Sequence, residues 1–107
     1  MSDEQVIYRF STQYTRYPGG RLRKHGPYSG EEFREDVLWS LLQGTAKIHI
    51  DLSNTYGFGS SFLDESFGEI GKRLGLAVCK QRMTFSSDDD PALVDLIWAK
   101  ITKASKS

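Results

Sequence analysis

The segment "AKIHIDL" (46–52) constrains the fold of this chain more than any other stretch. Apolar and polar side chains alternate along it, with Ala46, Ile48, Ile50 and Leu52 on one side and Lys47, His49 and Asp51 on the other. A period of two is typical of a β-strand with one buried and one solvated face. The sequence therefore predicts a sheet that is covered by other elements on one face and open to water on the other.

The segments around this strand alternate between strand and helix patterns. The predicted strands lie at 6–12, 46–52 and 76–85, and the predicted helices at 30–43, 61–74 and 91–104. Ser29 and Glu32 form a capping box for the first helix, and Asp90 with Pro91 begins the last one. This order predicts an α/β layer with right-handed crossovers and helices mainly on one face, in a single domain spanning 1–107.

The composition is that of an ordinary globular domain. With 14 basic and 14 acidic residues the net charge is zero, so attraction of the whole molecule to nucleic acid or an anionic membrane is not indicated. No apolar run approaches the roughly 20 residues that span a bilayer, and the amino-terminal residues lack a signal-peptide pattern. We therefore expect a cytoplasmic protein.

The residues that often bind metals do not form a recognisable motif. The single cysteine, Cys79, lies in the apolar run "LAVCK" of the third predicted strand, which favours a packed thiol over a reactive one. His25 and His49 have no metal-binding spacing with Cys79 or with the acids. Asp51, at the end of its strand, is expected to hydrogen-bond the following turn. The sequence predicts no metal and no cofactor.

The irregular segment 13–28 is rich in basic and aromatic residues, with a short hairpin expected around 21–23. The range 5–30 contains no acidic residue. A mixture of cations and tyrosines suits a protein interface, and it also suits contacts with single-stranded nucleic acid. The candidate contact residues of this loop are its cations Arg16, Arg21, Arg23 and Lys24. The alternative is a solvated loop that balances the acids of the following "EEFRED".

The segment "GFGSSFLDESFG" (57–68) passes from a glycine-rich loop into an amphipathic helix. Ser61 is the expected N-cap, with Asp64 closing a capping box, which leaves Ser60 to offer its hydroxyl to a phosphate or a partner. This loop follows a strand, at the edge of the sheet where ligands of α/β proteins gather. Its other candidate contact residues are Tyr56, Phe58 and Gly59. The "GFG" lacks the later glycine and lysine of a phosphate-binding loop.

Two segments of the chain resemble known proteins. "IHIDLSNTYGFGSSFLDESFGEIGKRLG" (48–75) is similar to the central strand, loop and helix of STAS domains, the fold of the anti-sigma-factor antagonists. "RYPGGRLRKHGPYSGEEFRE" together with "GSSFLDESFG" resembles more closely the STAS-like domains of unknown function, a bacterial family. The resemblance implies an α/β, STAS-like fold, for which we expect a mixed sheet with helices mainly on one face.

The resemblance also implies a partner and a modification. The antagonists dock onto a histidine-kinase-like ATPase that phosphorylates a serine at a helix start, within the motif Asp-Ser-Ser-Gly. The matching positions here are Gly59, Ser60, Ser61 and Phe62, so two of the four residues differ. The first serine is the phosphoacceptor in that motif, which makes Ser60 the phosphorylation candidate. The missing acid at Gly59 removes a group that could orient the hydroxyl.

We therefore predict a non-catalytic regulatory protein-interaction module, with a histidine-kinase-like ATPase as the expected partner. Two alternatives from other classes stay open. One is a small protein or enzyme that binds a phosphorylated metabolite or nucleotide through the helix start near Ser61 and Arg21 or Arg23. The other is a nucleic-acid binder that uses the basic loop 16–24.

Overall fold

A computed structural model describes residues 4–106 of the chain. Its sheet contains β1 (Gln5–Arg9), β2 (Lys47–Asp51) and β3 (Met83–Ser86), in the order β1-β2-β3. Both pairings are parallel, with Ile7 beside His49 and His49 beside Thr84. The described sheet is therefore parallel throughout, and the predicted mixed sheet is wrong. The reason is that helical crossovers join consecutive strands and return the chain in the same direction.

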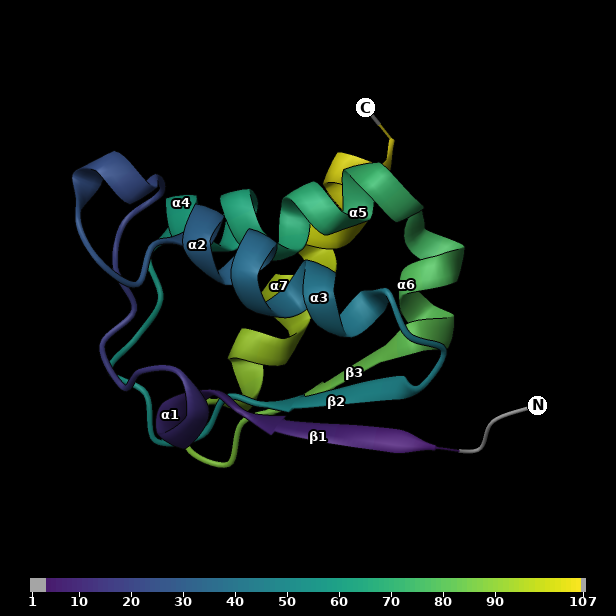
Figure 1. The fold of residues 1–107 in the computed structure, drawn as a ribbon, viewed down its shortest axis with the longest axis horizontal. Coiled ribbons are helices and arrows are strands. Elements are labelled where there is room, and N and C mark those ends of the chain that lie inside the picture. Colours follow the sequence, from purple (N-terminus) through teal and green to yellow (C-terminus); the bar gives the residue numbers. More distant parts are fainter. Residues whose placement is uncertain (1–3, 107) are drawn as a thin grey trace.

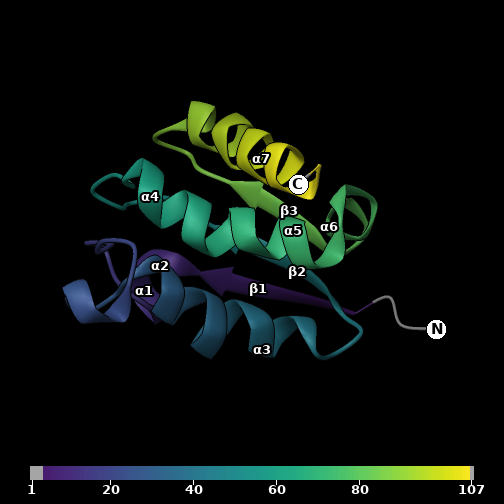
Figure 2. The ribbon, with the colours of Figure 1, turned by 90° about the horizontal axis from the view of Figure 1, so that it is seen from above.

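Two long helical segments and a third helix lie side by side over the sheet (Figure 1, Figure 2). The first runs through α2 (Gly30–Glu32), the π-helical segment η2 (Phe33–Leu38) and α3 (Trp39–Leu42). The second runs through α4 (Ser60–Leu63), the π-helical segment η3 (Asp64–Gly68) and α5 (Glu69–Leu74), and the third is α7 (Pro91–Ser105). All three cover the same face, as predicted.

The core lies between these helices and the sheet, and phenylalanine rings fill much of it. The fully buried side chains include Phe10, Phe33, Phe62, Phe67, Ile48, Ile50, Met83 and Ile97. The ring centroid of Phe33 lies 5.0 Å from that of Phe10 and 5.7 Å from that of Phe67. Such edge-to-face contacts add to the stabilisation that comes from burial alone.

The opposite face of the sheet carries polar side chains, as the alternation in β2 predicts. The apolar Ile7 also lies on this face, in register with His49, and is 47% exposed. The two ring nitrogens of His49 lie 2.7 Å from the Thr84 hydroxyl and 2.8 Å from the Ser86 hydroxyl, so the imidazole is held across the strands. No described helix packs against this face (Figure 1).

Two predicted strands are partly helical. The first strand ends at Arg9, because Phe10 turns into the core and starts α1 (Phe10–Gln13). The third predicted strand, 76–85, is mostly the helix α6 (Leu76–Arg82), and only its end forms β3. Gly75, with a φ of 83°, redirects the chain between α5 and α6, a conformation that glycine adopts without a Cβ clash.

Cys79 is buried, as predicted, but it lies on α6 and not on a strand. Its Sγ lies 3.9 Å from the carbonyl oxygen of Ile70. Burial raises the pKa of the thiol to about 11, so very little thiolate is present near neutral pH. The side chain therefore behaves as a small apolar core residue.

The loop between α1 and α2 is closed by backbone hydrogen bonds. Gly19 N–H donates to the Tyr28 carbonyl at 2.8 Å, and Gly30 N–H donates to the Gly20 carbonyl at 2.9 Å. The hairpin expected around 21–23 is absent from this described segment, which instead contains the short 3-10 helix η1 (Arg23–His25). The predicted cap at Ser29 is confirmed, since its hydroxyl oxygen accepts from the Glu32 N–H. None of the described helices is long and apolar enough to cross a membrane.

Candidate functional site at the carboxyl ends of the strands

The loops that follow the three strands meet at one end of the sheet (Figure 1). Asp88 N–H donates to the Ser53 hydroxyl at 2.8 Å, and Asn54 N–H donates to an Asp89 carboxylate oxygen at 3.2 Å. Asp51 accepts from Ser53 N–H at 3.0 Å, which confirms the predicted turn contact and holds the pKa of this carboxyl below its ordinary value. These contacts give the loops a defined shape.

An exposed aromatic patch, made of Arg16, Tyr17 and Tyr56, lies on these loops. The two tyrosine rings are stacked, with centroids 4.8 Å apart and an interplanar angle of 6°. The Arg16 guanidinium carbon lies 5.1 Å from the Tyr56 centroid, and its Nε donates to the Asn54 carbonyl at 3.2 Å. Tyr17 and Tyr56 remain 63% and 65% exposed. Two predicted contact residues, Arg16 and Tyr56, are therefore brought together in the structure.

Phe58 and Gly59 do not join the aromatic patch. The Phe58 ring turns inward, 5.0 Å from the Phe10 ring and 5.4 Å from the Phe62 ring between centroids. It anchors the loop on the core because an aromatic ring gains more from burial than from solvent exposure. Gly59 is the residue immediately before the helix α4. Both residues therefore shape the loop that presents Tyr56.

The basic loop does not form one positive surface. Arg23 pairs with Asp36 at 2.6 Å, and Arg21 lies 3.3 Å from Glu65 and 3.9 Å from Asp64. Of the four cations predicted as contacts, Arg16 lies on the aromatic patch, Arg21 and Arg23 pair with helix acids, and Lys24 is exposed. The Arg23 pair agrees with the alternative interpretation, in which the loop balances the acids of "EEFRED".

The helix that contains the two serines begins at Ser60, one residue earlier than predicted. Gly59 occupies the N-cap position and makes no side-chain cap, so the predicted cap by Ser61 and Asp64 is wrong. Asp64 instead pairs with Lys100 of α7 at 3.0 Å. The same ammonium group donates to the Ser60 hydroxyl at 2.7 Å. Ser60 is thus an exposed hydroxyl beside a lysine, at the start of a helix.

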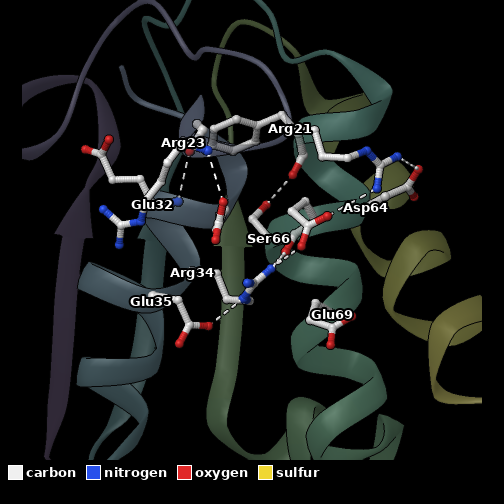
Figure 3. A network of polar contacts seen from close by, with 12 residues as sticks. Arg21, Arg23, Glu32, Arg34, Glu35, Asp64, Ser66 and Glu69 are labelled. Carbon is white, nitrogen blue, oxygen red and sulfur yellow. Dashed lines mark hydrogen bonds and ion pairs between the residues drawn. The ribbon is translucent and has the colours of Figure 1, made fainter. Parts of the chain in front are cut away.

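A buried arginine that sequence reasoning missed joins the first two helical segments (Figure 3). Arg34, with a side chain only 9% exposed, pairs with Glu65 and also donates to the Glu65 carbonyl at 2.6 Å. It contacts Glu35 at 2.6 Å, and Arg73 reaches the same carboxylate at 2.9 Å. The hydrogen bonds from Arg34 and Arg73 hold the pKa of Glu35 below its ordinary value.

This Arg34 network positions the helix that carries Ser60. Arg34 lies on the π-helical segment η2 and Glu65 on η3, so their ion pair joins the two helices. Such segments often occur near functional sites. The sequence signal for this buried arginine was weak: Arg34 is a charged residue between the apolar residues Phe33 and Val37. The rest of "EEFRED" resembles a solvated helix surface.

An open parallel sheet, covered on one face and carrying its exposed loops at the strand ends, defines an α/β domain. The model of the family described as STAS-like domain of unknown function (DUF4325) matches residues 29–92, which is well over half of the chain. The chain belongs to this family. No curated protein and no solved structure gives a significant match. Among the described residues, no cluster of three or more His, Cys, Asp or Glu side chains could hold a metal ion.

Proposed function

We propose that this domain is a non-catalytic regulatory module of the cytoplasm that docks on a protein partner through the aromatic patch. The observation that carries the proposal is the exposed stack of Tyr17 on Tyr56. Tyrosine and arginine are over-represented among the residues that dominate binding energy at protein interfaces. The Arg16 contact and the Tyr56 N–H bond to the Arg16 carbonyl, at 2.8 Å, hold the rings in place before binding. Such pre-organisation reduces the entropy lost on association.

The partner that the STAS resemblance favours is a histidine-kinase-like ATPase, with Ser60 as the modified residue. Ser60 is four positions after Tyr56, so a partner seated on the patch would lie near its hydroxyl. A phosphate on Ser60 would gain Lys100 as a counter-charge, because the ammonium group is already within hydrogen-bond distance. Asp64 would repel the same phosphate, and the two would compete for Lys100.

Replacing Tyr56 by alanine should weaken docking by about 30-fold, corresponding to about 2 kcal/mol for a central aromatic contact. The partner is recovered from cells with the wild-type domain, purified, and titrated against each variant. Leu96→Ala is the control, because Leu96 is an exposed apolar residue on α7 that is not part of the aromatic patch. Equal affinities for wild type, Tyr56→Ala and Tyr17→Ala would rule out the aromatic patch as the contact surface.

Incubation with the purified partner and ATP should phosphorylate Ser60, as read by mass spectrometry of the intact domain and its peptides. Ser60→Ala should abolish the modification, whereas Ser61→Ala should retain it. Both variants should keep their stability within about 0.5 kcal/mol, because neither hydroxyl caps the helix. Ser60→Asp should weaken docking by adding charge near Asp64 and Glu65. An unmodified wild-type domain, together with wild-type affinity of Ser60→Asp, would remove Ser60 from the proposal.

A further inference from the structure

A pocket of about 330 Å³ lies between the helix 60–74 and the carboxyl-terminal half of α7. The two helices approach closely at Gly71, where an added Cβ would lie 2.7 Å from the Ile101 carbonyl oxygen. The small residues Gly68 and Ala104 line the pocket and leave it open. The volume is within the range of about 300 to 1,000 Å³ found for small-molecule sites. The pocket is built from different residues than the aromatic patch.

The pocket is lined by charges of both signs with an excess of positive charge. Arg21, Lys100 and Lys103 line it together with Asp64 and Glu69. Asp64 is paired with Lys100 at 3.0 Å, whereas the one contact of the Glu69 carboxylate with another described side chain is a distant one, with Arg73 at 3.9 Å. The Lys103 ammonium group has no hydrogen-bond or ion-pair partner within the described residues 4–106. A free cation therefore lies beside a weakly paired carboxylate.

We propose that this pocket binds a small phosphorylated sugar or polyol. Its phosphate would lie on Lys103 and Lys100, with Arg21 closing the site, since cationic donors form strong hydrogen bonds to phosphate oxygens. Its hydroxyl groups would donate to Glu69 and Asp64, because ionised carboxylates only accept hydrogen bonds. Inorganic phosphate alone would bring negative charge towards both carboxylates and would have only its own P–OH protons to donate to them. The two kinds of charge therefore select a ligand with an anionic end and a hydroxyl-bearing body.

Lys100 connects this pocket to Ser60. Its ammonium group is shared between the Ser60 hydroxyl, at 2.7 Å, and the Asp64 carboxylate, at 3.0 Å. A ligand phosphate that recruits Lys100 would compete with Ser60 for the same donors. Occupancy of the pocket would therefore change the environment of the Ser60 hydroxyl. Binding in the pocket itself needs no protein partner, so it is tested on the isolated domain.

The test is calorimetric titration of the purified chain with glucose 6-phosphate and ribose 5-phosphate. Lys103→Met should weaken binding of at least one of them about tenfold or more, because it removes one charge-assisted hydrogen bond and keeps the side-chain length. Lys72→Met is the matched control, since Lys72 is an exposed lysine of α5 outside the pocket. It should change the affinity by less than about twofold.

Two further ligands separate the sugar phosphate from its parts. Inorganic phosphate and glucose should each bind at least about tenfold more weakly than the better sugar phosphate, because each uses only one side of the pocket. Dissociation constants above about 10 mM for both sugar phosphates would overturn the proposal. Equal binding of inorganic phosphate would overturn it as well, as would equal losses in Lys103→Met and Lys72→Met.

Discussion

Replacing Phe67 by alanine should lower the free energy of unfolding by about 3 to 5 kcal/mol, the usual cost of removing a buried phenylalanine. Phe67 is fully buried. Its ring lies 5.7 Å from that of Phe33 and 5.2 Å from that of Phe85, between centroids. It therefore connects three parts of the core: the helix 60–74, the helix 30–42 and the strand β3. Alanine would leave a cavity that all three would have to close.

Urea unfolding followed by circular dichroism measures this loss. A domain of this size has a total stability of about 5 to 15 kcal/mol, so the variant should unfold at a much lower urea concentration. Leu96→Ala removes an apolar side chain that is 43% exposed on α7 and should cost at most about 1 kcal/mol. A loss below about 1 kcal/mol for Phe67→Ala would mean that this ring does not hold the layers together.

Replacing Arg34 by methionine should destabilise the domain by about 3 kcal/mol, because a buried ion pair that loses one partner leaves the other charge uncompensated. Glu65 would keep only its surface contact with Arg21, at 3.3 Å, and its carbonyl would lose the donor that now lies at 2.6 Å. Glu35 would retain Arg73. The two π-helical segments would then face each other without the group that joins them.

A double variant distinguishes a broken ion pair from lost packing. Arg34→Met combined with Glu65→Met should recover part of the lost stability, since an apolar pair can replace a buried ion pair. Arg23→Met is the control, because its pair with Asp36 is exposed on both sides and such pairs contribute little. Urea unfolding of all variants gives the comparison. A double variant as unstable as the sum of the two single variants would argue against the ion pair.

Local sequence patterns predicted β2 and the helix 30–42 well. The alternation of Ile48 and Ile50 with His49 requires an extended backbone if one face is to be buried. Ser29 ends the preceding loop, and its hydroxyl oxygen caps the helix by accepting a hydrogen bond from the Glu32 N–H at 3.0 Å. In the segment 76–82 the same reasoning failed. Leu76 and Cys79 are three positions apart, which is the spacing of one helical face, but the short continuous apolar run that contains them is also typical of a buried strand.

The candidate site was predicted only in part. Tyr56 and Ser60 were recognisable because glycines mark their loop and a helix pattern follows. The stack of Tyr17 on Tyr56 could not be predicted, since the two residues are distant in the sequence and meet only when the loops pack together. The prediction that Ser61 caps the helix failed for the same reason. Lys100 is distant from Asp64 in the sequence, and their ion pair, which keeps Asp64 from closing a capping box, forms only in the folded structure.

The short-range spacing of apolar and polar residues therefore determined the α/β class, the solvated sheet face and the order of the elements. The reason is that the backbone conformation fixes the direction in which each neighbouring side chain points. Only the packed structure decided which charges meet. Arg34 with Glu65, and Lys100 with Ser60, come from different helices. Their side chains reach each other because the closely packed helical layer brings distant segments within a few ångströms, a property that no local pattern records.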